Sequence, residues 1–245
     1  MKHILVYLSL VAGLLVSCQR TSQFTIEGVV SHAEGETLYL EHTSLMQTSV
    51  VDSCVLTAKG DFLLKASAPQ YPDFYRLRIG RNSLILAIDS TEVITITATR
   101  DSLANTLAIE NSDNTLMIAQ LRAMAHASSR EDLREEAKKI IVANPRSLAA
   151  YYAVFMKQNG EYIWNIFDPS DRRMFQAVAT SFHTWMPNYE RTKALYIQVK
   201  EVMQVERNAT HQAAVREMID NADEQKRYTG FSDRLRELIG KKEHA

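Results

Sequence analysis

Cysteine, glycine and proline are scarce in this chain. Its 245 residues include two cysteines, eight glycines and five prolines. Two cysteines exclude a disulfide framework, and no Cys-x-x-Cys pattern, the dithiol of redox and zinc sites, occurs. The glycines are scattered and form no phosphate-binding loop, which excludes the nucleotide-binding motifs that depend on one.

An excess of charge of one sign is also missing. Lysine and arginine number 28 and aspartate and glutamate 29, so the formal net charge is −1. Nucleic-acid-binding domains carry a basic patch, often with a pI above about 9, so no nucleic-acid partner is predicted. The histidines do not occur in a His-x-x-x-His pattern, and we predict neither a metal site nor another cofactor; those in the body of the chain are His32, His42, His126, His183 and His211.

The chain has no apolar run long enough to span a membrane. After Met1-Lys2-His3 it reads "ILVYLSLVAGLLV". The apolar run is about 14 residues long, whereas a membrane-spanning helix needs roughly 20. A short basic start, an apolar stretch and small residues at its end are the parts of a secretory signal.

The end of this stretch, "LVSC", resembles a bacterial lipobox, with Leu15, Ser17 and Cys18 in the expected order. The resemblance implies that residues 1–17 are removed as a signal peptide and that Cys18 carries a diacylglycerol and a further acyl chain such as palmitate. Each buried CH₂ contributes about 0.8 kcal/mol, and more than one chain gives stable anchoring. The alternatives are an ordinary cleaved signal beside a coincidental cysteine, or a short uncleaved anchor.

Lipidation at this cysteine predicts where the protein resides. We expect it to be held in the cell envelope by its N-terminal lipid, facing the periplasm from the outer membrane. Residues 18–23 would then form a tether between the lipid and the folded part.

Residues 24–110 show the pattern of short strands. Segments such as "FTIEGVV", "ETLYLEH" and "EVITITA" alternate apolar and polar residues, as half-buried strands do. Turn signals such as Lys59-Gly60-Asp61 separate them at about 8–12 residues, a spacing typical of β-sandwiches. We predict an antiparallel β-sandwich of about seven or eight strands.

Residues 111–245 change to the helical period of 3.6. Ser129 is predicted to cap a helix over "SREDLREEAKKIIVA", and Asp168-Pro169 predicts the start of another. Beyond Pro187 the sequence predicts two long amphipathic segments and then a short, weakly held helix over residues 233–239 that covers the helical core. The predicted fold class is therefore α+β, a sandwich followed by an all-helical region packed against it.

The order of these motifs resembles a known family. "FTIEGVV", "VVDS", "GDFLL", "YPDFYRLRI" and "LILAIDSTEVITI" are similar to the N-terminal domain of unknown function that precedes the thioredoxin-like domain in bacterial envelope lipoproteins of the disulfide-interchange type. "NPRSLAAYYAVF" and "HTWMPNYERTKALYIQVKEV" are similar to the helical connector of those proteins. The resemblance extends over nearly all of the chain after the signal.

The motif that carries the chemistry of that family does not occur. Its thioredoxin-like fold bears Trp-Cys-x-x-Cys, whose first thiol reacts because its pKa is depressed. Here neither Trp164 nor Trp185 is followed by cysteine, and "GFSDRLRELIGKKEHA" leaves no room for that fold. We expect a non-enzymatic binding or scaffolding module with a protein partner in the envelope. The alternative is an accessory or truncated relative of a thiol-disulfide oxidoreductase.

Two features remain as candidate sites. Cys54 in "DSCVL" is predicted to be a small core residue, with a reactive thiol as the alternative. Aromatic residues are concentrated between residues 151 and 189, and most are predicted to form the core of the helical region. Any that stay exposed would form a partner surface, for which the candidates are Tyr162, Trp164, Trp185 and Tyr189.

Overall fold

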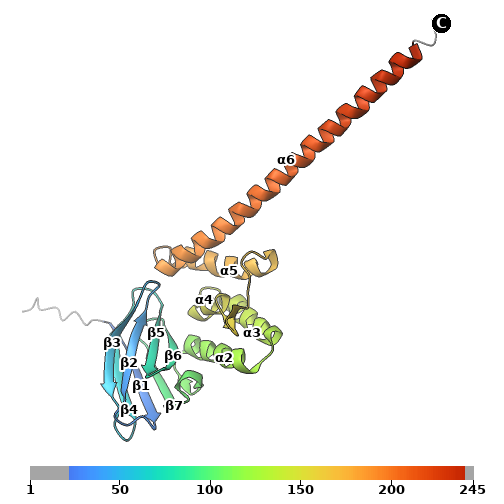
Figure 1. Cartoon of the computed structure of the whole chain (residues 1–245). Helices are drawn as coiled ribbons and strands as arrows, with labels where there is room; N and C mark the ends of the chain where they lie inside the picture. Colours follow the sequence, from blue (N-terminus) through green and yellow to red (C-terminus); the bar gives the residue numbers. More distant parts are fainter. Residues whose placement is uncertain (1–21, 241–245) are drawn as a thin grey trace, which may run out of the picture.

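The computed structural model describes residues 22–240, so the predicted signal peptide, Cys18 and most of the predicted tether lie outside the described residues. Strands come first in the chain and helices follow (Figure 1). This order confirms the predicted α+β class.

The sandwich ends with a short 3₁₀ turn and a two-residue strand. Its elements are β1 (Gln23–Ser31), β2 (Thr37–Thr43), β3 (Thr48–Val55), β4 (Asp61–Ser67), β5 (Asp73–Ile79), β6 (Asn82–Ile88), β7 (Val93–Thr99), η2 (Leu103–Asn105) and β8 (Ile109–Glu110). The helical region also contains a small β-hairpin after its third helix. Its elements are α2 (Asp113–Ala127), α3 (Arg130–Ala143), α4 (Leu148–Val154), β9 (Lys157–Gln158), β10 (Glu161–Tyr162), α5 (Pro169–Trp185) and α6 (Glu190–Gly240).

The sandwich consists of two four-stranded sheets, ordered β4-β1-β7-β8 and β3-β2-β5-β6. Most neighbouring strands pair antiparallel, as predicted, but β1 and β7 run parallel from the pair Thr25 and Val93 to the pair Ser31 and Thr99. These strands are far apart in the sequence and meet at the centre of one sheet. Local alternation predicts that a strand exists, but it carries no information about the direction of such a long-range pairing.

Alternation along the strands fills the space between the sheets. Phe24 and Ile26 of β1 and Leu38 and Leu40 of β2 point inward and are fully buried. Burying a side chain of this size contributes about 1.5–3 kcal/mol. The core of the sandwich thus follows directly from the period-2 pattern.

Gly28 of β1 lies opposite Ile96 of β7, where the two backbones approach closely. Its φ is +145°, and a Cβ atom at this position would lie 1.9 Å from the carbonyl oxygen of Ile96 on β7. A backbone atom cannot move aside without disturbing the ladder. The parallel pair therefore requires glycine at this position.

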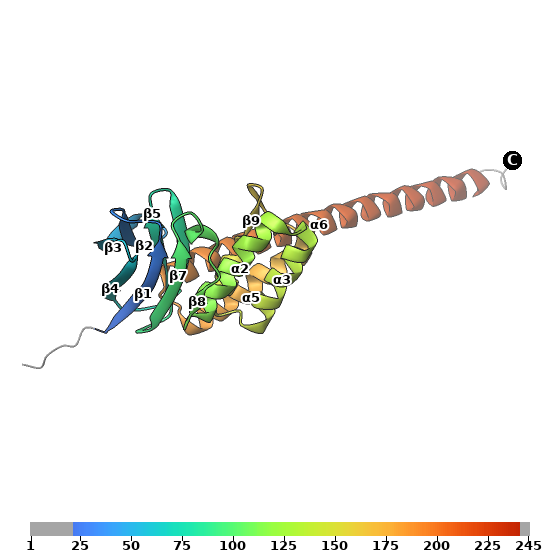
Figure 2. The same ribbon diagram turned by 90° about the horizontal axis from the view of Figure 1, so that it is seen from below.

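The helical region lies at one side of the sandwich (Figure 2) and packs on the faces of β5 and β6 that point away from the sandwich core. Phe74, Ile85 and Ala87 project from these faces into the helical core. The hydroxyl of Thr115 on α2 accepts a hydrogen bond from the amide of Ala87 at 3.0 Å. The sandwich and the helical region are therefore packed against each other through this interface.

The predicted helix starts are confirmed. Ser129 precedes α3 and its side chain accepts a hydrogen bond from the amide of Asp132. Asp168 precedes α5 and accepts from the amides of Ser170 and Asp171. Each cap satisfies amide groups that have no partner within the helix, an effect worth about 1 kcal/mol.

The prediction beyond Pro187 is wrong in one respect. Instead of separate segments, the structure has a single helix, α6, of 51 residues. Its first turns pack on the body through Leu195 and Val199, and the remainder extends away from it (Figure 1). Residues 233–239 belong to this extension and lie far from the helical core, so they do not form the predicted separate cover. No proline interrupts the chain after Pro187, which lets the helix continue. Within residues 22–240, no helix is both long and apolar enough to cross a bilayer.

The close approach at Gly28 gives a test of the parallel pair. We expect Gly28→Ala to lower the free energy of unfolding by about 3 kcal/mol, because it adds both a clash and backbone strain. Gly35→Ala is the matched control: φ there is +76°, but nothing lies within 4 Å of the added atom. It should lower that free energy by about 1 kcal/mol. Urea unfolding followed by circular dichroism measures both, and equal losses would contradict the close approach.

Candidate functional site

A cavity lies between the outer face of the β3-β2-β5-β6 sheet and the helices, with a volume of about 600 Å³. Strands β5 and β6, helices α2, α4 and α6, and the β9–β10 hairpin contribute to its walls. Binding sites for small molecules typically occupy about 300–1,000 Å³ and have mostly apolar and aromatic walls. The aromatic residues of this cavity are Phe74, Tyr75, Tyr151, Tyr152, Phe155 and Tyr162.

The charged residues lining this cavity are all basic. They are Arg76, Arg122 and Arg191. Arg76 pairs with Glu41, and Arg191 pairs with Asp73. Arg122 forms no ion pair with any residue in the described part of the chain. The cavity therefore contains one guanidinium group whose charge is not balanced by a contacting carboxylate.

A polar cluster around Asp73 fixes the start of α6 against the sheet. Oδ1 of Asp73 accepts hydrogen bonds from the hydroxyl of Tyr189 at 2.7 Å and from Nε of Arg191 at 3.0 Å. Oδ2 lies 2.8 Å from Nε2 of His42, and Arg191 also donates to the backbone carbonyl of Thr43. Strands β2 and β5 are thereby joined to α6. The cluster sets the position of one wall of the cavity.

The cluster keeps the Asp73 carboxylate charged. Partial burial by itself would raise the pKa of Asp73, but hydrogen bonds from His42, Tyr189 and Arg191 outweigh it and hold the pKa below its ordinary value. Burial and the neighbouring carboxylate both raise the pKa of Tyr189. At neutral pH Asp73 is therefore an acceptor and Tyr189 a donor.

A second ion cluster joins β2 and β5. Glu41 is buried, and its carboxylate accepts hydrogen bonds from Nε of Arg76 at 2.6 Å and from Nε of Arg78 at 2.8 Å. The guanidinium of Arg78 also lies 4.4 Å from the ring centroid of Tyr39. Two guanidinium groups share one carboxylate, which leaves a positive charge in excess beside the cavity.

Three tyrosines that line the cavity, Tyr75, Tyr151 and Tyr152, remain protonated at neutral pH. Burial raises the pKa of Tyr151, and it raises the pKa of Tyr152 although Arg122 opposes the shift. Burial, helped by Asp73, raises the pKa of Tyr75 to about 12. The aromatic walls thus offer hydroxyl donors and apolar ring faces, and no negative charge.

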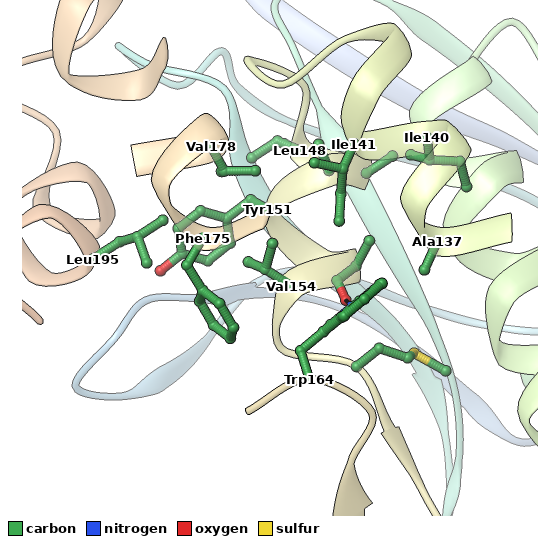
Figure 3. Close-up of a cluster of buried hydrophobic side chains, with 14 of the residues drawn as sticks. Ala137, Ile140, Ile141, Leu148, Tyr151, Val154, Trp164, Phe175, Val178 and Leu195 are labelled. Carbon is green, nitrogen blue, oxygen red and sulfur yellow. Dashed lines mark hydrogen bonds between the residues drawn. The ribbon is translucent and has the colours of Figure 1, made fainter. Parts of the chain in front are cut away.

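Two of the four predicted partner-surface residues are buried, and for them the prediction is wrong. Trp164 lies inside the helical core (Figure 3). Its Nε1 donates to the carbonyl of Ala153 at 3.0 Å, and the guanidinium of Arg134 lies 4.3 Å from the ring centroid. Tyr189 is buried in the Asp73 cluster. Both side chains have found internal partners for their polar groups, which allows burial.

The other two predicted residues are exposed but lie at different places. Tyr162 forms part of the cavity rim and is 51% exposed, with Nζ of Lys157 4.3 Å from its ring centroid. Trp185 ends α5 and is 64% exposed, with the guanidinium of Arg146 5.1 Å from its ring centroid. Only Tyr162 belongs to the cavity described above.

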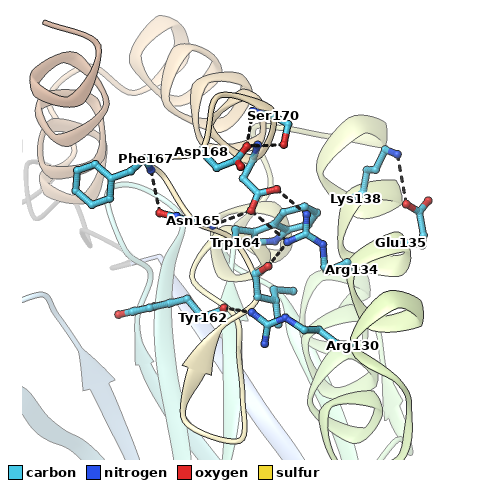
Figure 4. Close-up of polar contacts among 12 residues, drawn as sticks. Arg130, Arg134, Glu135, Lys138, Tyr162, Trp164, Asn165, Phe167, Asp168 and Ser170 are labelled. Carbon is cyan, nitrogen blue, oxygen red and sulfur yellow. Dashed lines mark hydrogen bonds and ion pairs between the residues drawn. The ribbon is translucent and has the colours of Figure 1, made fainter. Parts of the chain in front are cut away.

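The loop that follows the hairpin is held by arginines of α3 (Figure 4). Arg130 donates to the carbonyl of Tyr162, and Arg134 donates to the carboxylate of Asp171 at 2.6 Å. That carboxylate also accepts from the amide of Asn165 at 2.9 Å. Burial would raise the pKa of Asp171, but these hydrogen bonds hold it below its ordinary value. The rim near Tyr162 is therefore fixed in place.

Cys54 lies on β3, an edge strand, and is half-buried against the sandwich core. Burial and then Asp52 raise the pKa of its thiol. Redox-active thiols have depressed pKa values and positive neighbours, so the surroundings of Cys54 disfavour the thiolate. Among the residues that the structure describes, no group of three or more histidine, cysteine or acidic side chains could hold a metal ion.

Sequence reasoning did not single out Arg122, Arg191 or Asp73. Arg191 and Asp73 are 118 residues apart in the chain. Asp73 occurs in the strand-like segment "YPDFYRLRI" and Arg122 in the helical segment "AQLRAMAHA", where nothing sets either charge apart from its neighbours. No short-range pattern indicates that these side chains meet.

Comparison with known proteins gives one match to a family model. Residues 24–118 match the family described as Domain of unknown function (DUF4369). The match continues past the predicted sandwich boundary at residue 110 into α2, the helix that packs directly on β6. The family model therefore covers both the sandwich and the first turns of α2.

No curated protein matches the chain. Among solved structures, a 9R-lipoxygenase from Cyanothece PCC8801 aligns with 7% sequence identity and a TM-score of 0.20, over 51% of this chain and 25% of the lipoxygenase chain. A TM-score this low supports no statement about fold or function.

The Asp73 cluster predicts how stability depends on pH. The folded-state pKa of Asp73 lies below its unfolded value of about 3.9, so its contribution is present above about pH 4 and is lost as the pH falls through the folded-state pKa. Arg191→Met should lower the free energy of unfolding at pH 7 by about 3 kcal/mol, because it removes a charge partner of a largely buried carboxylate. Urea unfolding at pH 7 measures this loss.

Asp89→Asn is the matched control, because removing this charge should not lower the free energy of unfolding. Asp89 is exposed, but the protein atoms around it desolvate its carboxylate and raise its pKa despite a hydrogen bond from Asn114, so its ionisation works against folding. This substitution should leave the stability at pH 7 unchanged or higher. If Arg191→Met and Asp89→Asn behave alike, the proposed role of the Asp73 cluster is wrong.

Proposed function

We propose that the protein is a lipid-anchored, non-catalytic binding module of the cell envelope. The sequence "LVSC" supports the anchor, with Cys18 as the acylated residue. The observation that carries the binding role is the aromatic cavity of about 600 Å³ between the sheet and the helices. Its volume and composition match those of small-molecule sites.

The residues that line the cavity favour binding over catalysis. They include no histidine, cysteine, aspartate or glutamate, the side chains that most often transfer protons or attack a substrate. Tyr151 and Tyr152 stay protonated because burial raises the pKa of each. Such walls can hold and orient a ligand through ring faces and hydrogen-bond donors.

The redox alternative has less support. It would act through Cys54 or by docking to a complete thioredoxin-like partner. The thiol of Cys54 lies beside Asp52, and both burial and that carboxylate raise its pKa. A thiol in such surroundings reacts slowly with disulfides at neutral pH.

The arrangement of the elements suits a protein held at its N-terminus. A tether over residues 18–23 spans at most about 20 Å, which would keep the sandwich near the membrane surface. Helix α6 begins beside the sheet and leads away from the body on the side opposite the start of β1 (Figure 2). Its 51 residues correspond to about 75 Å. The helix would then project into the envelope space, where a scaffolding contact could form.

Anchoring is tested by replacing the acylated residue. Cells that express the protein and are fed a clickable palmitate analogue should incorporate the label, and Cys18→Ala should abolish both labelling and sedimentation with membranes. Cys54→Ala is the matched control and should change neither, because Cys54 lies in β3. Lipid labelling that survives Cys18→Ala would disprove the anchor.

Occupancy of the cavity is tested separately with the chain from residue 19, which retains every described residue. Nile red, a neutral dye, should bind with increased fluorescence. Ala194 on α6 is exposed and lines the cavity, so Ala194→Phe should fill space there and reduce dye binding about tenfold or more. Ala209→Phe makes the same change further along the same helix and should have no effect. Equal dye binding by both variants would show that the cavity is not the binding site.

A further inference from the structure

The charges and walls of the cavity define the chemistry of its ligand. We propose that the cavity binds a single-chain amphipathic organic anion, such as a fatty carboxylate, with its head group at Arg122. This inference rests on the proposed binding function and adds to it the ligand class and the residue that selects it.

Arg122 is the group that selects a negative charge. It lies on α2, lines the cavity, and has no ion-pair partner among the side chains that the structure describes. Arg76 and Arg191 line the same space but are already paired with Glu41 and Asp73. A guanidinium group has five donors in a planar fork that fits a carboxylate or phosphate in two parallel hydrogen bonds. Arg122 therefore has the donors free for a ligand.

The surroundings of Arg122 add to this preference. No acidic residue lines the cavity, and the sheet beside it carries Arg76 and Arg78 on the single carboxylate of Glu41. Tyr152 lies close enough to Arg122 for the guanidinium to influence its pKa, and its hydroxyl stays protonated. A head group at Arg122 would thus meet a positive field and a neighbouring hydroxyl donor.

The remaining walls fit an apolar body. Phe74 and Leu195 are buried members of the helical core that also line the cavity, and Ile85 and Phe155 pack against the same core. Each CH₂ group moved from water into such surroundings contributes about 0.8 kcal/mol. A chain of twelve carbons occupies roughly three-fifths of the cavity of about 600 Å³, if each carbon takes about the volume of a water molecule, 30 Å³.

A cationic ligand is the main alternative. Aromatic side chains attract ammonium groups through their ring faces, and six aromatic side chains line this cavity. The guanidinium of Arg122, which has no carboxylate in contact among the described residues, opposes a further positive charge. The two alternatives predict opposite charge preferences for ligands with the same chain, so one pair of ligands distinguishes them.

The test uses the chain from residue 19 and calorimetric titration with dodecanoate and dodecyltrimethylammonium, each below its critical micelle concentration. We expect dodecanoate to bind at least about tenfold more tightly than the cation. Arg122→Gln should weaken dodecanoate binding about tenfold and leave binding of the cation unchanged or stronger. Arg122→Lys keeps the charge but loses the planar fork of donors, so its affinity for dodecanoate should lie between those of the unsubstituted protein and Arg122→Gln.

Arg146→Gln is the matched control. Arg146 is also an arginine beside an aromatic ring, that of Trp185, but it lies outside the cavity, so its loss should leave dodecanoate binding unchanged. Equal affinity for the two probes, a preference for the cation, or an unchanged affinity of Arg122→Gln would overturn the anion assignment. If Nile red still binds and Ala194→Phe still blocks it, the ligand class alone is wrong. If Nile red does not bind, the binding function itself fails.

Discussion

The contact on which the rest of the structure depends is the one between the Asp73 carboxylate and Arg191. A largely buried carboxylate is stable only when cations and donors surround it, and here Arg191, Tyr189 and His42 supply them. Because those partners come from α6, the segment before it and β2, the sheet and the long helix are fixed relative to each other. The position of α6 then closes one side of the cavity and sets the direction in which the helix leaves the body.

The charge of the cavity is a consequence of how its arginines are paired. Asp73 and Glu41 lie on the sheet and neutralise Arg191 and Arg76, whereas Arg122 enters from α2 without a carboxylate in contact. A cavity with aromatic walls would ordinarily accept neutral or cationic ligands. The unpaired guanidinium shifts that preference to anions. An acylated Cys18 would hold such a site at a membrane surface, where single-chain amphiphiles are available.

Much of the fold could be predicted because it depends on neighbours in the sequence. Alternation identified the strands, and Ser129 and Asp168 marked the helix starts at which they act as caps. The direction of the β1–β7 pair and the continuity of α6 could not be predicted in this way. The first depends on two segments that meet only in the folded sheet. The second depends on a helix that continues beyond the body, where packing no longer marks its length.

The sequence by itself determined the strands of the sandwich, the starts of α3 and α5, and the cysteine that is proposed to carry the lipid, because each is read from a few adjacent residues. The tertiary structure alone decided the site. It buried Trp164 and Tyr189, left Tyr162 on the cavity rim, and brought together Asp73 and Arg191 across 118 residues. Periodicity shows which face of a strand or helix is apolar, but it does not specify which distant side chain will neutralise a charge. That choice depends on the packing of whole elements, and within the described part of the chain it leaves Arg122 as the arginine of the cavity without a contacting carboxylate.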